Sequence, residues 1–183
     1  MSVTVRTAIR EDAAAISRVR VDTWRAAYTG LIAPEILDRM DVERETQLRH
    51  DRWDELHADP RGAELIAESG GAVAGWAAIG PSIDDDLPGN GQVYAIYALP
   101  EHWAQGVGHA LMVAAEERLR RAGFTRAHLW VLDRNARAAA FYERHGWIED
   151  GATMTDERRI GGTSHVLFER RRVRDLSEPT PLR

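Results

Sequence analysis

Two glycines, Gly106 and Gly108, sit where the sequence pattern changes from strand to helix. Residues 93–99 form an apolar run typical of a β-strand, Pro100 marks a turn, and periodic apolar positions from Val107 indicate a helix. The first N–H groups of a helix lack intrahelical acceptors and, with the helix dipole, attract anions. Because glycine has no side chain to block close approach, the spacing predicts a phosphate-bearing ligand held by main-chain amides.

Other phosphate-binding loops fit this segment less well. A P-loop needs a lysine directly after its second glycine, and no lysine occurs here. A dinucleotide fingerprint needs a third Gly or Ala three residues after Gly108, where this chain has Leu111. Asp133, at the end of the next strand, could act as a ribose-binding acid, so a dinucleotide-binding domain stays an alternative. Two glycines alone also fit an ordinary solvent-exposed loop.

A second patterned segment, residues 129–147, follows at a distance of about thirty residues and places five residues in a recognisable order: Asn135, Ala138, Tyr142, Gly146 and Trp147. The two segments together resemble the GNAT superfamily of acetyl-coenzyme A-dependent N-acetyltransferases. The family's loop motif, Gln/Arg-x-x-Gly-x-Gly/Ala, falls on residues 103–108, with Trp103 in place of the usual Gln or Arg. Its later motif, Asn-x-x-Ala-x-x-x-Tyr-x-x-x-Gly-Phe, falls on the five residues just named. The resemblance covers roughly residues 63–147.

The resemblance implies how acetyl-coenzyme A would be held. In the family the strand before the loop splays from the next strand and lends backbone groups to the pantetheine arm and the thioester carbonyl. The loop amides take the pyrophosphate, and Asn135 hydrogen-bonds the cofactor arm, although Asn at this position is also an ordinary helix N-cap. The implied cofactor contacts are Ile96, Tyr97, Ala98, Ala104, Gln105, Gly106, Val107, Gly108, His109, Asn135, Ala138 and Tyr142.

The same resemblance implies that Tyr142 is the catalytic general acid, which protonates the departing thiolate. A phenol can do this at neutral pH because it stays protonated; a half-buried core tyrosine is the alternative. The general base that many relatives use is absent. Many relatives carry a Glu near the start of the key strand, where this chain has Gln92, and Gln cannot accept a proton. Water, backbone carbonyls or an acid among residues 84–86 could replace it, although three adjacent acids in a loop are usually solvated.

Trp24 and Tyr28 are spaced four residues apart, so they share one helix face. A Trp-x-x-x-Tyr pair at this place is similar to one in a subset of small bacterial relatives. The pair is either core or an aromatic wall for the acceptor amine. Trp103 is better explained as a packing residue than as a catalytic one.

The whole chain is compatible with one soluble cytoplasmic domain. It has 183 residues, a net charge of −5 and no cysteine, which excludes disulfides and a cysteinyl acyl-enzyme and favours direct transfer. No histidine spacing suggests a metal, and no segment suggests a membrane span. The arginines at 170–172 and 174 read as a solvated tail rather than a nucleic-acid patch. We expect a single domain over residues 1–174, a loose tail over 175–183 and, because relatives often dimerise, a homodimer.

Periodicity and turn residues predict an α+β (mixed α/β) fold with a central mixed, mostly antiparallel sheet. The expected strands are 3–9, 63–68, 72–79, 92–99, 126–132, 147–153 and 164–169, and the expected helices are 11–27, 34–40, 41–57, 107–122 and 134–145.

The resulting hypothesis is an N-acetyltransferase that moves an acetyl group from acetyl-coenzyme A to a primary amine of a small molecule or a peptide. A coenzyme A-binding regulatory or inactive GNAT-like module is the alternative, favoured by Gln92 and opposed by Tyr142.

Overall fold

A computed structural model describes residues 2–160 and 162–178 of the chain. Its strands form one sheet in the order β1-β2-β3-β4-β5-β7-β6, in which only the β4–β5 pair is parallel. This confirms the predicted α+β class with a mostly antiparallel sheet. The strands are β1 (Val3–Thr7), β2 (Ala63–Ser69), β3 (Ala72–Pro81), β4 (Gly91–Ala98), β5 (Arg126–Leu132), β6 (Ile148–Ile160) and β7 (Thr163–Asp175).

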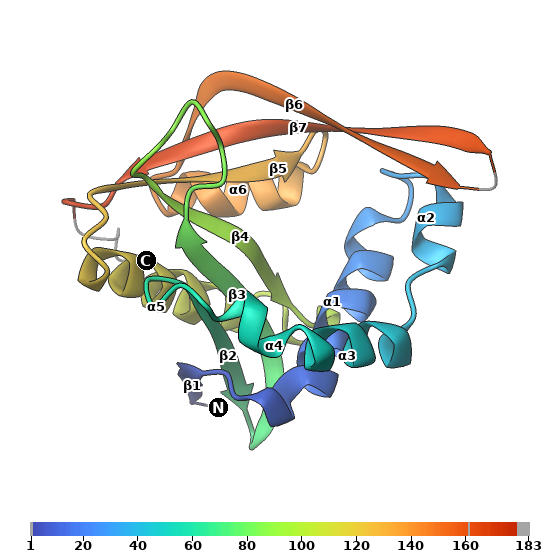
Figure 1. Cartoon of the computed structure of the whole chain (residues 1–183), viewed down its shortest axis with the longest axis horizontal. Helices are drawn as coiled ribbons and strands as arrows, with labels where there is room; N and C mark the ends of the chain where they lie inside the picture. Colours follow the sequence, from blue (N-terminus) through green and yellow to red (C-terminus); the bar gives the residue numbers. More distant parts are fainter. Residues whose placement is uncertain (1, 161, 179–183) are drawn as a thin grey trace.

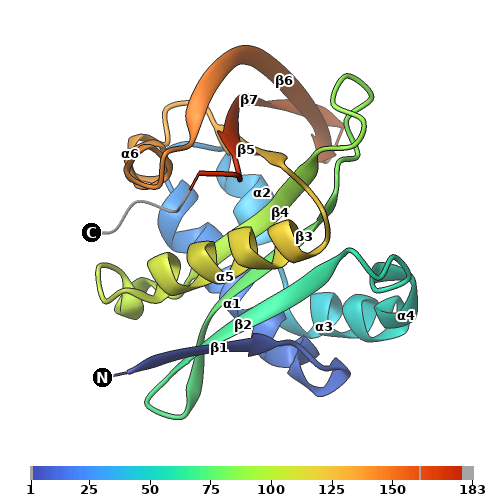
Figure 2. The ribbon, with the colours of Figure 1, turned by 90° about the vertical axis from the view of Figure 1, so that its left-hand side faces the viewer.

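Helices cover both faces of the sheet. They are α1 (Ala13–Tyr28), α2 (Pro34–Asp38), α3 (Val42–Asp51), α4 (Trp53–Leu56), α5 (Val107–Arg121) and α6 (Ala136–Arg144), with short 3-10 turns η1 (Arg10–Asp12) and η2 (Pro100–His102). Figure 1 shows β2, β3 and β4 running down the molecule while β5, β7 and β6 lie across its top. Helix α5 crosses one face of the β1–β4 half, and α1 packs on the other face against β3 and β4 (Figure 2).

The two halves of the sheet meet only briefly. Strands β4 and β5 pair at two positions, Gly91 with Ala127 and Gln92 with His128, and beyond these they part. Gly91 allows this close junction, because a Cβ there would lie 2.9 Å from a methyl carbon of Leu119 and 3.2 Å from the Phe124 ring. The splay that the family resemblance implied is therefore present.

A β-bulge in β4 accompanies the parting. The register against β3 shifts between Ala78 and Ile79, whose partners are Ala95 and Val93, so Tyr94 is an extra residue in β4. A bulge increases local twist and re-aims the strand. The Tyr94 side chain turns to the exposed surface, where its hydroxyl donates to the Pro81 carbonyl.

Most predicted elements are confirmed with small shifts at their ends, but the last two strands are much longer than predicted. Strands β6 and β7 form a hairpin arm that extends past the edge of the sheet (Figure 1). Its outer part is rich in charged residues, such as Asp156 and Arg158, so it lacks the apolar alternation that marks a half-buried strand. The expected tail also starts later, because Asp175 ends β7 and Leu176 is buried; residues 179–183 lie outside the described part.

The interpretation of the C-terminal arginines as a solvated tail is wrong. Arg171, Arg172 and Arg174 lie in β7 and are buried. Arg171 pairs with Asp86 and Asp150. Arg172 pairs with Glu143 and Glu149, and Arg174 lies 3.1 Å from the buried carboxylate of Glu116. Acids on neighbouring elements thus compensate each buried guanidinium, which a charge run read along the sequence does not reveal.

Across residues 2–160 and 162–178, no helix combines the length and the apolar character needed to cross a bilayer.

Gly75 in β3 lets α5 approach the sheet. A Cβ at this position would lie 2.8 Å from the Tyr97 carbonyl oxygen, 2.8 Å from a Val107 methyl and 2.9 Å from a Leu111 methyl. We predict that Gly75→Ala lowers the free energy of unfolding by about 1–3 kcal/mol, the usual cost of overpacking. Urea denaturation checks this. An unchanged or higher unfolding midpoint would show that α5 is not held against the sheet at this glycine.

Candidate active site

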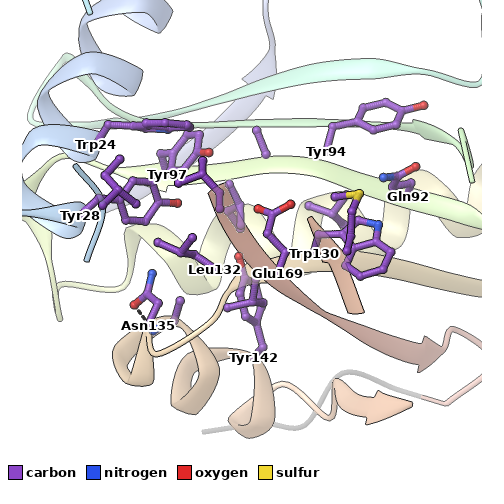
Figure 3. A pocket seen from close by; sticks show the side chains of 18 of the residues that line it. Trp24, Tyr28, Gln92, Tyr94, Tyr97, Trp130, Leu132, Asn135, Tyr142 and Glu169 are labelled. Atoms are coloured by element: carbon purple, nitrogen blue, oxygen red, sulfur yellow. Dashed lines mark hydrogen bonds between the residues drawn. The ribbon is translucent and has the colours of Figure 1, made fainter. Parts of the chain in front are cut away.

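The space between the parted strands is a cavity of about 240 Å³. Its walls come from α1, β4, β5, α6 and the β6–β7 arm, as Figure 3 shows from close by. The lining is mainly aromatic and aliphatic, with few polar groups: Trp24, Tyr28, Ile32, Ile83, Gln92, Val93, Tyr94, Ala95, Ile96, Tyr97, Trp130, Val131, Leu132, Asn135, Ala138, Tyr142, Met154, Leu167 and Glu169. A largely apolar pocket with a few convergent polar groups is typical of a ligand site.

Helix α1 supplies an aromatic wall to this cavity. Trp24 and Tyr28 both line it, and their rings meet edge to face with centroids 4.9 Å apart. Burial raises the pKa of the Tyr28 hydroxyl well above its ordinary value, and the electrostatic effect of the neighbouring Tyr97 hydroxyl raises it further. The Trp24 indole N–H is buried near the Tyr97 hydroxyl without a hydrogen bond of good geometry. The structure therefore brings the predicted acceptor wall into the same cavity as five of the predicted cofactor residues, and it places the loop residues 104–109 outside the cavity lining. The five are Ile96, Tyr97, Asn135, Ala138 and Tyr142.

Strand β4 presents only part of its backbone to the cavity. The Leu99 N–H donates to the Ala74 carbonyl, and in an antiparallel pair the bonded positions alternate. Tyr97, opposite Trp76, therefore turns its backbone toward β3, whereas Ile96 and Ala98 turn theirs toward the gap. The prediction that all three lend backbone groups needs refinement, because Tyr97 contributes its side chain instead.

The Ala98 carbonyl is already occupied. It accepts hydrogen bonds from the Thr23 hydroxyl at 3.0 Å and from the Trp103 indole N–H at 2.7 Å. The groups that β4 offers to a ligand beside β5 are therefore the Ile96 N–H and C=O and the Ala98 N–H. These are the groups that an extended, amide-bearing chain could pair with, as an added strand does.

The glycine loop leads from the end of β4 into α5. Ala104 and Gly106 have positive φ angles of 60° and 91°, and Gly106 is the N-cap residue of α5. The first intrahelical bond runs from the Ala110 N–H to the Gly106 carbonyl. The N–H groups of Val107 and Gly108 precede it and have no acceptor within the helix, as the anion-site prediction requires.

Gly108 has a packing role besides the predicted one. A Cβ there would lie 3.3 Å from the Phe141 ring, so the missing side chain also lets α6 pack against α5. A hydrogen bond of 2.9 Å between His109 and His145 joins the same two helices.

Trp103 has the packing role that the sequence indicated. Its indole N–H ties the loop to the Ala98 carbonyl, and the guanidinium carbon of Arg137 lies 3.1 Å from its ring centroid. Arg137 belongs to the first turn of α6, so this stack spans the gap between the two halves of the sheet.

Helix α6 begins beside the cavity. The Asn135 side-chain oxygen accepts from the Ala138 N–H at 3.1 Å, which confirms the N-cap interpretation. In Figure 3 the Asn135 amide nitrogen points away from the helix. Asn135 can thus cap α6 and still donate to a ligand. Asn135 and Ala138 both line the cavity.

Tyr142 lies two turns further along α6 and also lines the cavity. Its side chain is 9% exposed, and burial raises the pKa of its hydroxyl above the ordinary phenol value. The hydroxyl therefore stays protonated across the neutral range. A buried phenol that faces a cavity can donate a proton there, as the predicted role of Tyr142 requires.

The acids that the sequence suggested as a base do not line the cavity. Asp84 accepts from the Trp130 indole N–H at 2.8 Å and lies 3.0 Å from His128. Asp86 pairs with Arg171, and Asp85 is exposed. Gln92 is buried and accepts from the Ile83 N–H at 3.0 Å, so it anchors the loop before β4.

The acid that does line the cavity is Glu169, which sequence reasoning missed. It lies in β7 opposite Leu132 of β5 and Met154 of β6. Figure 3 shows its carboxylate among the labelled aromatic residues of the site. Burial raises the pKa of this carboxyl group. A signal was present in the alternation, since Glu169 shares a strand face with Leu167, a buried residue.

Comparisons with known proteins agree with this geometry. The model of the acetyltransferase (GNAT) family matches residues 24–147. The chain belongs to the GNAT family. It is 32% identical over 143 residues to the uncharacterized N-acetyltransferase YuaI of Bacillus subtilis, covering 78% of this chain and 79% of that one.

Solved GNAT structures share the fold of this chain. The PaiA N-acetyltransferase of Thermoplasma acidophilum, in complex with coenzyme A, superimposes with a TM-score of 0.69 at 16% identity and covers 93% of this chain and 99% of its own. The structure of yncA from Salmonella typhimurium, with its cofactor acetyl-CoA, gives 0.68 at 21% identity and covers 96% of this chain and 95% of its own.

Within the described part of this GNAT chain, no three His, Asp or Glu side chains form a group that could hold a metal ion. That the enzyme works without a metal stays a prediction.

We predict that a negative charge in the glycine loop before α5 weakens coenzyme A binding. Gln105 is exposed directly before the N-cap, so Gln105→Glu adds charge without disturbing the core. Charges near a helix terminus are worth about 0.3–1 kcal/mol, so affinity should fall about two- to fivefold at low salt and less at high salt. Calorimetric titration of coenzyme A measures this. Gln47→Glu, on exposed α3, is the matched control, and equal affinities of the two variants would exclude this loop as the pyrophosphate site.

Proposed function

We propose that this protein transfers the acetyl group of acetyl-coenzyme A directly to a primary amine in the cavity between β4 and β5. The observation that carries the proposal is the parting of these strands after Gln92, with a free helix N-terminus at one end of the gap and Tyr142 beside it. Coenzyme A and acetyl-CoA occupy two of the structural neighbours. A small molecule or a peptide amino group could serve as the acceptor.

The cofactor would run from the α5 N-terminus into the gap. Its pyrophosphate would accept from the first amides of α5. Its pantetheine arm contains amides, which could pair with the open backbone groups of Ile96 and Ala98. The thioester would then lie near Tyr142, with Asn135 beside the arm. Of the residues named here, Ile96, Asn135 and Tyr142 line the cavity.

The acceptor would enter against the aromatic wall of α1. Trp24 and Tyr28 give an amine with an apolar or aromatic body a surface to pack on. When both ligands are enclosed in the cavity, water is excluded and the local dielectric constant is low. The hydrogen bonds that polarise the thioester carbonyl are therefore stronger than in water. The amine nitrogen would attack that carbon, and the carbon–sulfur bond would break. The Tyr142 hydroxyl would protonate the sulfur and would recover a proton from the nitrogen.

The direct test is release of coenzyme A thiol from acetyl-coenzyme A in the presence of a panel of primary amines. The chain has no cysteine, so a thiol reagent reports only the product. Amine-dependent release supports transfer. Binding of acetyl-coenzyme A without release for any amine in a broad panel would favour the inactive-module alternative.

We predict that transfer needs no covalent acetyl-enzyme. The chain contains neither cysteine nor lysine, the side chains that most readily carry an acetyl group. Intact-mass spectrometry after incubation with acetyl-coenzyme A alone should show no stoichiometric adduct. An adduct that passes its acetyl group to an added amine would contradict direct transfer.

We predict that Tyr142→Phe lowers kcat by about 10²–10⁴-fold, the usual contribution of general acid catalysis. The ring and its packing remain, so coenzyme A affinity and the unfolding midpoint should change little. Burial raises the pKa of Tyr142, so its hydroxyl should stay protonated at moderately alkaline pH. Wild-type kcat should therefore not fall there through ionisation of Tyr142. Wild-type turnover in the variant, measured where chemistry is rate-limiting, would return Tyr142 to a packing role.

A further inference from the structure

Glu169 is a carboxylate in the active-site cavity that the proposed function has not used. We infer that Glu169 binds the ammonium group of the acceptor and then takes its proton, so that the attacking nitrogen is a free amine. This inference rests on the proposed transfer reaction and adds to it the general base that Gln92 cannot supply.

The Glu169 carboxylate lacks the ion-pair partner that neighbouring acids have. Other acids on the same part of the sheet have arginine partners: Asp133 with Arg170, Asp150 with Arg171, and Glu149 with Arg172. Among residues 2–158 and 162–178, no hydrogen bond or ion pair reaches the Glu169 carboxylate, although the residue is half-buried. A buried charge is costly unless it is paired. A cationic ligand would supply the missing partner.

Three cavity-lining tyrosines surround Glu169 (Figure 3). Its charge acts on the hydroxyls of Tyr28, Tyr97 and Tyr142, each of which lines the same cavity. These residues come from α1, β4 and α6, three different walls. Glu169 therefore lies between the aromatic wall proposed for the acceptor and the tyrosine proposed for the thiol. From β6, Asp156 and Arg158 also act on Glu169, with opposite signs.

The proton balance is complete with these two residues. One proton passes from the ammonium nitrogen to a Glu169 oxygen, which leaves a neutral amine. The amine lone pair forms the carbon–nitrogen bond, and the electron pair of the broken carbon–sulfur bond goes to sulfur. Tyr142 gives its proton to that sulfur and recovers the second nitrogen proton. Glu169 later releases its proton to solvent, so the products are an amide, a thiol and one proton.

The test uses two aromatic amines that differ in charge at neutral pH: benzylamine, which is protonated, and aniline, which is not. In the conservative variant Glu169→Gln, kcat/KM for benzylamine should fall about 10²–10⁴-fold, while kcat/KM for aniline should change little. The matched control is Glu157→Gln, which removes the same charge from an exposed position on the same hairpin arm. That control should keep wild-type values for both amines.

The pH profile separates a base from a packing residue. With benzylamine, wild-type kcat/KM should fall as the pH drops through the pKa of the base. The Glu169→Gln profile should instead rise with pH in proportion to free benzylamine. Loss of activity by the same factor for benzylamine and aniline, or no loss for either, would overturn the role of Glu169.

A failure of the proposed function would look different. If wild-type protein acetylates neither amine, benzylammonium is titrated calorimetrically onto the coenzyme A complex, with benzyl alcohol as the neutral probe. Glu169→Gln should weaken the binding of benzylammonium and leave that of benzyl alcohol unchanged. Equal affinity of wild type and variant for benzylammonium, or no detectable binding to either, would overturn the inference.

Discussion

Strands β4 and β5 pair at only two positions and then separate, and the surrounding elements are arranged around that gap. Two neighbouring strands that separate after two paired positions leave backbone N–H and C=O groups without a strand partner. Such groups are costly when buried and unpaired. Side chains supply one of the missing partners, because Thr23 and Trp103 both donate to the Ala98 carbonyl. The groups that stay open, on Ile96 and Ala98, are those that an amide-bearing ligand could complete.

Keeping the gap open requires other elements to hold the two halves of the sheet together. An apolar cluster from α1 and α2 reaches across to β5 and β7, and includes Val21, Ile36, Leu132 and Leu167. On another side of the gap, the stack of Arg137 on Trp103 joins α6 to the glycine loop. The buried arginines of β7 tie its strand to surrounding acids. The cavity is therefore framed by contacts between elements that are distant in sequence.

Local patterns in the sequence predict the elements that carry the motifs. Gly106 and Gly108 mark the start of α5, and Asn135 marks the start of α6. The structure has both helix starts at these residues, because helix caps and positive φ angles depend on nearby residues. The cavity residues of α1 and α6 also follow from helical spacing. Family membership adds the splay, which periodicity alone does not reveal.

What the sequence could not predict depends on contacts between distant segments. Arg171 and Arg172 look solvated as a charge run, and only the packed sheet shows the acids around them. Asp84 looks like a free loop acid until Trp130 is seen to bind it. Glu169 lies beyond both motifs, on an arm longer than the sequence pattern predicts. Its alternation with Leu167 indicates a buried face, but only the pairing of β7 with β5 determines which cavity that face lines.

A crystal structure of the protein with coenzyme A bound would test the proposed site. We expect the pyrophosphate within hydrogen-bond distance of the first amides of α5. We also expect the pantetheine arm between β4 and β5, paired with Ile96 and Ala98, and the sulfur next to the Tyr142 hydroxyl. Coenzyme A bound elsewhere on the protein, with the gap between the strands empty, would contradict this placement.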